Sequence, residues 1–242
     1  MEQAVLTRHA ESEYSLRGAV NGDASVAVAL TEEGRAQARR LGERLRGEPV
    51  DLCVISEFPR VRETADLALE GREVPRLVLP ELNEIGFGGY EGRPFEEYRV
   101  WAGTAAPDAE EHGGDSRVAA ARRYARAFRA VLARPEPLIL VVTHGLPIRY
   151  VLNAAEGIAP APLLDAVPYA ELHRFSARAL AEAVERLEDW CAARPGDPRE
   201  RRRSSLGGPL GRSRRRGVRR PTLGNAQSPL KRVIVPGRRG RR

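Results

Sequence analysis

Side chains that can bind or attack an anion follow each of three apolar segments in this sequence. The segments are residues 4–6, 52–55 and 138–142, and the side chains that follow them are Arg8, His9, Ser56, Arg60, Thr143 and His144. If the segments are adjacent parallel strands, these side chains meet at the carboxyl edge of one sheet, where α/β proteins bind ligands. The sequence therefore predicts a pocket in which imidazole and guanidinium groups converge.

The expected ligand of this pocket is an anion. Two histidines can also hold a metal ion, but the fixed charges of Arg8 and Arg60 would repel a divalent cation. The planar fork of arginine instead matches the oxygens of a phosphate group. Gly145 and Pro147 begin a predicted helix directly after His144, so backbone N–H groups there also point towards the pocket. Neither a metal nor a cofactor is expected.

Each of these residues also has an interpretation without a functional role. A histidine at a strand end is most often a polar residue with satisfied hydrogen bonds, and Arg60 could lie on a solvated helix face. The occurrence of several such residues at matching strand ends favours a functional site.

Strand-like and helix-like patterns alternate in residues 1–194, which predicts an α/β fold. The unbroken apolar run at 138–142 predicts a strand buried on both faces, in the centre of a parallel sheet. Thr31, Ser116 and Ser176 are expected helix N-caps. The helices are expected over residues 31–47, 61–69, 116–132 and 176–190.

Composition indicates a soluble protein, since 42% of the 242 residues are hydrophobic. No stretch approaches the roughly 20 apolar residues of a membrane helix. The N-terminus lacks the basic and apolar regions of a signal peptide, so a cytoplasmic location and no membrane partner are expected. Cys53 and Cys191 lie in apolar patterns, which predicts two buried thiols rather than a disulfide.

The formal charge of +7 comes from one end of the chain. Residues 195–242 contain sixteen Arg or Lys against Asp197 and Glu200, so the rest of the chain is acidic. This arginine-rich tail has no sustained apolar periodicity and is expected to be disordered. It could attract RNA or a membrane surface. A dispensable extension is favoured, because a single lysine, Lys231, against 39 arginines indicates a coding bias.

Five blocks, in order, resemble motifs of the histidine phosphatase superfamily, the phosphoglycerate mutase-like proteins. They are LTRHAES at 6–12, LTEEG with QA at 30–38, SEFPRVRETA at 56–65, LNE with FG and EG at 82–92, and VTHG at 142–145. The resemblance covers residues 4–190 and implies a three-layer α/β/α sandwich with a mostly parallel central sheet.

The resemblance also implies roles for individual residues. His9 would be the nucleophile that forms a phosphohistidine, while Arg8, Arg60 and His144 hold the phosphoryl oxygens. Glu84 would protonate the leaving group and then activate water, although its spacing alone indicates a surface carboxylate. Further phosphate or substrate contacts are expected from Ser15, Asn21 and Gly145.

Departures from the mutase pattern favour hydrolysis of a small phosphomonoester. Ser15 and Asn21 stand where mutases have Asn and Thr. A phosphoglycerate mutase with the same intermediate, or a non-catalytic module that binds phosphate or RNA, are the alternatives. Binding of nucleic acid is not expected of residues 1–194, and the tail is the one part of the chain that could attract it.

The segments expected to select the leaving group are 93–115 and 157–172. Four side chains could line that side of the pocket or belong to the core: Leu16, Phe87, Tyr90 and Tyr98. Asp115 and Ser116 resemble a further family element, and either touch the substrate or begin a helix. The substrate and the oligomeric state are not predicted.

Overall fold

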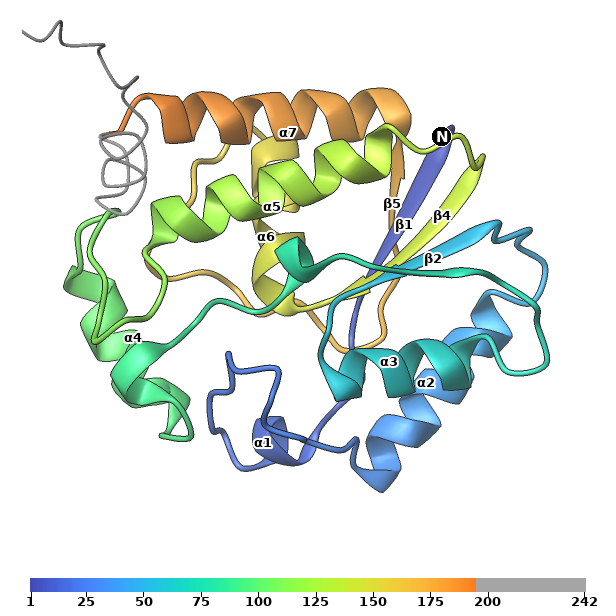
Figure 1. Ribbon diagram of the computed structural model, residues 1–242, viewed down its shortest axis with the longest axis horizontal. Helices are drawn as coiled ribbons and strands as arrows, with labels where there is room; N and C mark the ends of the chain where they lie inside the picture. Colours follow the sequence, from blue (N-terminus) through green and yellow to red (C-terminus); the bar gives the residue numbers. More distant parts are fainter. Residues whose placement is uncertain (195–242) are drawn as a thin grey trace, which may run out of the picture.

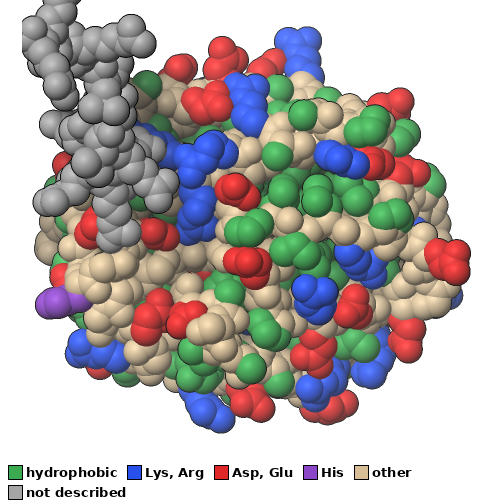
Figure 2. All heavy atoms as spheres, viewed as in Figure 1, with side chains coloured by type: hydrophobic (Ala, Val, Ile, Leu, Met, Phe, Trp, Pro, Cys, Tyr) green, Lys and Arg blue, Asp and Glu red, His purple; other side chains and the backbone are tan. Residues whose placement is uncertain are grey.

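The computed structural model describes residues 1–194 of the chain (Figure 1). The arginine-rich tail, residues 195–242, for which the sequence predicts disorder, lies outside the described residues. Within residues 1–194, no helix is both long and apolar enough to span a membrane. On the face seen in Figure 2, acidic and basic side chains are interspersed.

A five-stranded mixed sheet in the order β3-β2-β4-β1-β5 forms the middle layer. Its strands are β1 (Gln3–Arg8), β2 (Leu52–Ile55), β3 (Arg76–Val78), β4 (Leu138–Thr143) and β5 (His173–Ser176). Four strands run parallel, and only the edge strand β5 pairs antiparallel, with β1. Every residue of the central strand β4 is buried, which confirms the prediction from its unbroken apolar run.

Helices cover both faces of the sheet, which confirms the three-layer α/β/α fold (Figure 1). On one face, α2 (Glu32–Arg44) and α3 (Pro59–Ala68) pack against side chains such as Val5 and Leu140. On the other, α5 (Arg117–Leu132), α6 (Gly145–Ala155) and α7 (Ala177–Ala192) pack against the intervening residues of the same strands. This alternation follows from the two-residue period of a strand.

The predicted helix starts are confirmed by side-chain caps. The hydroxyl of Thr31 accepts from the N–H of Gly34 at 2.9 Å, and Ser116 and Ser176 cap α5 and α7 in the same way. Helix α2 ends at Arg44, earlier than the expected stop at Gly47. The elements absent from the sequence interpretation are β3, β5, α1 (Glu13–Leu16), α4 (Phe95–Thr104) and two short 3-10 helices, η1 (Pro80–Leu82) and η2 (Gly88–Tyr90).

Both cysteines are buried free thiols, as predicted. Cys53 lies in the core beneath α2 and α3, whereas Cys191 lies in the core on the opposite side of the sheet.

Candidate active site

The strands that precede the predicted site residues are adjacent and parallel, as the pocket hypothesis requires. Strand β4 pairs with β1 and with β2, and the register places Arg8 opposite Thr143 and Ile55 opposite Val142. The carboxyl ends of all three strands therefore lie at one edge of the sheet. The N–H of His9 donates to the carbonyl of Thr143 at 2.8 Å, which fixes the loop after β1 at this edge.

His9 is buried, with 3% of its surface exposed. Its Nδ1 lies 2.8 Å from the carbonyl oxygen of Ala10, an acceptor that places the ring proton on Nδ1. The lone pair of Nε2 then faces the guanidinium of Arg60, whose Nε donates to it at 3.2 Å. Burial, Arg60 and Arg8 hold the pKa of His9 well below its ordinary value. The imidazole is therefore neutral and nucleophilic at neutral pH.

Arg60 lies at the start of α3, and its guanidinium is held by several contacts. Its Nη1 donates to the side-chain oxygen of Asn21, and its Nη2 donates to the carbonyl of Asn21 at 3.1 Å. Its charge also lies 4.3 Å above the ring of Phe58. Burial lowers the pKa of Arg60 to about 10, so the side chain still carries its charge at neutral pH.

His144 lies beside His9 and is fully buried, with the two ring centroids 5.3 Å apart. Its Nδ1 lies 3.3 Å from Arg60 Nη2 and accepts from it, so Nε2 carries the proton and donates to the hydroxyl of Ser56 at 3.0 Å. Burial and the charge of Arg60 lower the pKa of His144 well below its ordinary value. The ring is therefore neutral.

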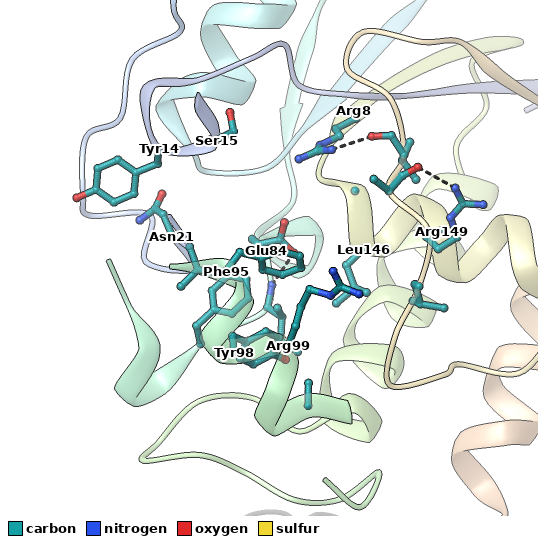
Figure 3. Close-up of a pocket in the computed structure, with 18 of the residues that line it drawn as sticks. Arg8, Tyr14, Ser15, Asn21, Glu84, Phe95, Tyr98, Arg99, Leu146 and Arg149 are labelled. Carbon is teal, nitrogen blue, oxygen red and sulfur yellow. Dashed lines mark hydrogen bonds between the residues drawn. The ribbon is translucent and has the colours of Figure 1, made fainter. Parts of the chain in front are cut away.

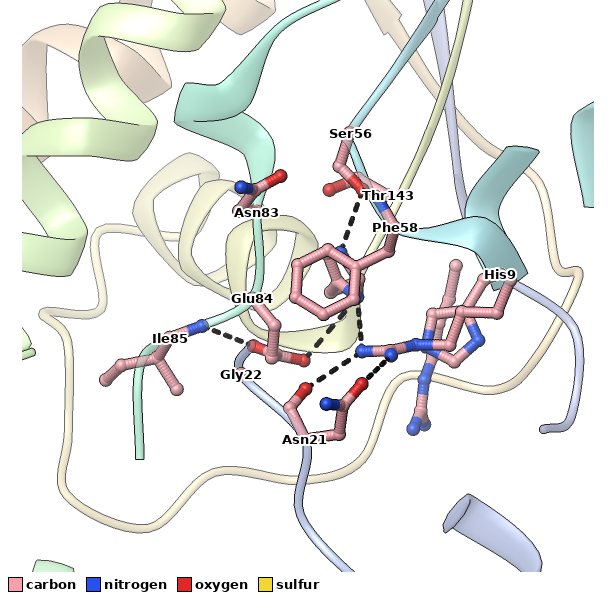
Figure 4. Close-up of polar contacts among 12 residues, drawn as sticks. His9, Asn21, Gly22, Ser56, Phe58, Asn83, Glu84, Ile85 and Thr143 are labelled. Atoms are coloured by element: carbon pink, nitrogen blue, oxygen red, sulfur yellow. Dashed lines mark hydrogen bonds and ion pairs between the residues drawn. The ribbon is translucent and has the colours of Figure 1, made fainter. Parts of the chain in front are cut away.

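Glu84 follows η1 and reaches the same place from the third side (Figure 4). Its Oε2 lies 3.9 Å from His144 Nδ1, and its Oε1 accepts from the N–H of Ile85 at 3.0 Å. Burial raises the pKa of Glu84, while the nearby arginines oppose that shift. A raised pKa makes the carboxyl group of Glu84 easier to protonate, which suits a proton donor.

An arginine that the sequence interpretation missed holds the loop of Glu84. Arg123, on α5, donates to the carbonyls of Glu81, Asn83 and Glu84 at 3.2, 2.6 and 3.0 Å. The same guanidinium pairs with Asp115 at 2.9 Å, and Asp115 also accepts from the N–H of Gly86 at 3.1 Å. Asp115 thus contacts this loop and does not line the pocket, while Ser116 caps α5.

Arg8 is anchored by the segment that leads into β5. Its Nη1 donates to the carbonyl of Val167 at 2.8 Å, and its guanidinium lies 4.0 Å from the ring centre of Tyr169. Its buried Nε has no hydrogen-bond partner among the described residues. A Cβ at Gly145 would lie 3.5 Å from that Nε, an ordinary contact, so a glycine is not sterically required there.

A pocket of about 290 Å³ opens above these groups (Figure 3). All but one of the site residues expected from the sequence line it, namely Arg8, His9, Ser15, Asn21, Arg60, Glu84 and Gly145. His144 is fully buried and does not line the pocket, but its Nδ1 contacts the Arg60 guanidinium. The hydroxyl of Ser15 is engaged locally, because it closes a capping box with Ser12 at the start of α1.

The expectations for the leaving-group side are met only in part. Phe87 and Tyr98 line the pocket, but Leu16 and Tyr90 do not. Leu16 is 67% exposed, because α1 turns it away from the fold, and Tyr90 packs against the rings of Tyr98 and Trp101. The segments 93–115 and 157–172 both contribute lining residues.

Replacing Asn21 by alanine is expected to lower kcat/KM about ten-fold, the effect of one hydrogen bond to a charged group. The amide oxygen holds Nη1 of Arg60, and without it the guanidinium can turn away from His9. Steady-state kinetics and thermal unfolding of the variant test this. Unchanged kcat/KM would show that Asn21 does not position Arg60.

The two neutral histidines predict a loss of stability in acid. Their pKa values are lowered in the folded state, so the unfolded chain binds more protons once the pH falls below 6.5. Each group contributes at most about 1.4 kcal/mol for each pH unit below that value. Urea unfolding at pH 7.5 and 5.5 measures the fall, which should be smaller in His9→Gln. An equal fall in both proteins would contradict the assignment of a neutral His9.

Among residues 1–194, no group of three or more His, Cys, Asp or Glu side chains is placed to hold a metal ion. The arrangement instead offers a nucleophilic nitrogen, fixed positive charges and a carboxyl group around one open space. These are the groups that phosphoryl transfer requires.

Comparisons with known proteins agree with this chemistry. The sequence model of the histidine phosphatase superfamily (branch 1) matches residues 4–202. The adenosylcobalamin/alpha-ribazole phosphatase of Salmonella typhimurium is 38% identical over 148 residues, which cover 57% of this chain and 72% of that protein. The phosphoglycerate mutase of Candida albicans is 28% identical over 207 residues, 78% of this chain and 80% of that protein.

A solved structure has the same fold. The crystal structure of the alpha-ribazole phosphatase from Shigella flexneri gives a TM-score of 0.61 at 26% identity, over 71% of this chain and 89% of that chain. The chain belongs to the histidine phosphatase superfamily. The resemblance inferred from the five sequence blocks is thus confirmed, and the protein is an enzyme, a histidine phosphatase.

Proposed function

We propose that the protein hydrolyses phosphomonoesters in two steps, through a phosphohistidine on Nε2 of His9. The observation that carries the proposal is the placement of this nitrogen. It is unprotonated, and it faces the Arg60 guanidinium at 3.2 Å, beside His144 and Glu84. A phosphoryl group bound to Arg60 would therefore lie next to the nucleophile.

In the first step, Nε2 of His9 attacks phosphorus, and the bond between phosphorus and the leaving oxygen breaks. Protonated Glu84 gives its proton to that oxygen, so the alcohol departs neutral. Arg8 and Arg60 hold the phosphoryl oxygens and stabilise their charge in the transition state. Nδ1 of His144 donates to a phosphoryl oxygen once the ring takes up a proton or changes tautomer. The hydroxyl of Ser56 stays hydrogen-bonded to Nε2, accepting from it in the protonated ring and donating to it in the other tautomer.

In the second step, water attacks the phosphohistidine from the position that the alcohol has left. Glu84, now ionised, takes a proton from this water, and His9 leaves as a neutral imidazole. This proton returns Glu84 to its starting state, and inorganic phosphate is released. Gly145 and Ser15 line the pocket and are proposed substrate contacts, while Asn21 acts by holding Arg60.

Hydrolysis is proposed in preference to a mutase reaction, which shares the first step. The similarity supports this choice, because the phosphatase from Salmonella typhimurium is 38% identical and the mutase from Candida albicans 28%. Alpha-ribazole phosphate is therefore a candidate substrate, alongside other small phosphomonoesters. A cytoplasmic location stays a prediction, as does any binding of nucleic acid by the tail.

The proposal is tested by release of inorganic phosphate from p-nitrophenyl phosphate in the presence of EDTA, with a panel that includes alpha-ribazole phosphate and 3-phosphoglycerate. Turnover by the wild type is expected. Isomerisation of 3-phosphoglycerate without phosphate release would favour the mutase. Absence of any reaction across the panel would overturn the proposal.

Glu84→Gln is expected to lower kcat/KM for alkyl phosphates about 100-fold or more, and kcat/KM for p-nitrophenyl phosphate much less, because kcat/KM reports the first step and not the later hydrolysis of the phosphohistidine. An alkoxide needs a proton to leave, whereas p-nitrophenolate does not. With an alkyl ester, wild-type activity should fall as the pH rises past the pKa of Glu84, which burial raises. Rate-pH profiles of both esters measure this. Equal losses of kcat/KM for the two esters would contradict the acid role.

A further inference from the structure

The pocket extends well beyond the residues assigned to the phosphoryl group. Its outer part lies between helix α4 and residues 161–167, and its apolar lining consists of Phe95, Tyr98, Ala102, Leu146, Leu163 and Leu164 (Figure 3). Phe95 and Leu163 are 49% and 48% exposed, so their apolar surfaces are accessible to a ligand in the pocket. We refer to this outer part as the outer chamber.

The walls of the outer chamber are supported by contacts within the protein. A Cβ on Gly103 of α4 would lie 3.7 Å from Leu163, so the two walls meet there. The ring of Tyr98 packs edge-to-face against the ring of Phe87, with centroids 4.8 Å apart. The space between the walls is thus a formed apolar surface, which favours a leaving group with an apolar, ring-sized body.

The outer chamber also carries positive charge that the reacting phosphate does not need. Arg99, Arg117 and Arg149 line it, against one acidic residue, Asp165. Glu84 is the one other acidic residue in the lining of the whole pocket.

The contacts of these arginines leave most of their charge available. Arg149 donates Nε and Nη2 to the main-chain carbonyls of Asp165 and Ala166 at 2.9 and 3.0 Å, and neutral carbonyls do not cancel its charge. Arg99 has an exposed pairing with Glu96 at 3.3 Å, which is a weak interaction in water. Figure 3 shows the Arg99 side chain extending towards Leu146, on the side of the pocket where Arg149 lies.

We propose that the outer chamber binds a leaving group that combines an apolar, ring-sized body with a second anionic group, held by Arg99 and Arg149. The proposal rests on the proposed function, since it names the class of phosphomonoester that the same site accepts. The ring packs on Phe95, Tyr98 and Leu163 while the ester phosphate lies at Arg60. The anionic end then reaches the guanidinium groups at the rim.

Two aryl phosphates of the same shape test the charge requirement. They are 4-(carboxymethyl)phenyl phosphate and its neutral amide, 4-(carbamoylmethyl)phenyl phosphate, in which a methylene group keeps the leaving phenols electronically similar. Binding to His9→Ala is measured by calorimetry, so that no turnover is needed. We expect the carboxylate to bind about ten-fold more tightly than the amide. Arg99→Gln and Arg149→Gln are each added to His9→Ala. In both of these proteins, the ratio of the affinities for the carboxylate and the amide should approach one.

Arg39→Gln is the matched control, because Arg39 is exposed on α2 and does not line the pocket. It should keep the full carboxylate preference. The amide ester reports whether each variant keeps an intact phosphate pocket, since its affinity should not change. Equal affinity for the two esters in the His9→Ala background, or a preference that survives both arginine substitutions, would overturn the proposal. Wild-type turnover of the amide ester tests the proposed function separately.

Discussion

His9→Ala is expected to lower kcat by about four orders of magnitude or more, the effect of removing a nucleophile that acts together with its neighbours. Within residues 1–194, no other imidazole is placed to replace it. The second imidazole, His144, is committed to Ser56 and Arg60, and its ring centroid lies 5.3 Å from that of His9. Initial rates with p-nitrophenyl phosphate measure the effect.

The matched control for this variant is His112→Ala. The side chain of His112 is exposed and does not line the pocket, so its loss should leave kcat unchanged. Thermal unfolding shows whether each variant folds. A folded His9→Ala protein with more than about one hundredth of wild-type kcat would mean that water attacks phosphorus directly.

Arg60→Lys is expected to lower kcat/KM about 1,000-fold, even though it keeps the charge. A lysine ammonium is a point charge and cannot reach all the groups that the guanidinium contacts together, namely His9, Asn21 and His144. Removal of a single preorganised donor to a transition-state oxygen typically costs about 100- to 1,000-fold. Arg60 also positions the groups around it, so the upper end of this range is expected.

Arg62→Lys serves as the control on the same helix, because Arg62 is exposed and does not line the pocket. It should retain wild-type kinetics. Comparison of the two variants separates the loss of the Arg60 guanidinium contacts from a general effect of an arginine-to-lysine change on the stability of α3. Activity of Arg60→Lys within ten-fold of the wild type would show that charge alone is sufficient, contrary to the geometry.

The sequence predicts the central part of the sheet because burial on both faces demands apolar runs, as in β4. The same runs locate Arg8, His9 and His144, since the residues after parallel strands share one edge. Strands β3 and β5 are only partly buried, and their short segments carry polar residues such as Arg76 and His173. Their pattern is therefore too weak to indicate a strand.

The contacts that position the site residues could not be predicted in the same way. Arg123 holds Glu84 through main-chain carbonyls, and Arg8 is held by the carbonyl of Val167. Every residue type has such a carbonyl, so the partner leaves no signal in the sequence. Glu84 itself required the family resemblance, because its place in the pocket depends on the turn that follows β3 and η1.

The phosphohistidine on His9 can be detected by trapping it. Glu84→Gln should react rapidly with p-nitrophenyl phosphate but hydrolyse the phosphoenzyme slowly, so the intermediate accumulates. After an alkaline quench, mass spectrometry of the peptides should place one phosphoryl group on His9, and His9→Ala should carry none. If the wild type and Glu84→Gln turn over the ester while His9 stays unmodified at every time point, the reaction does not pass through a phosphohistidine.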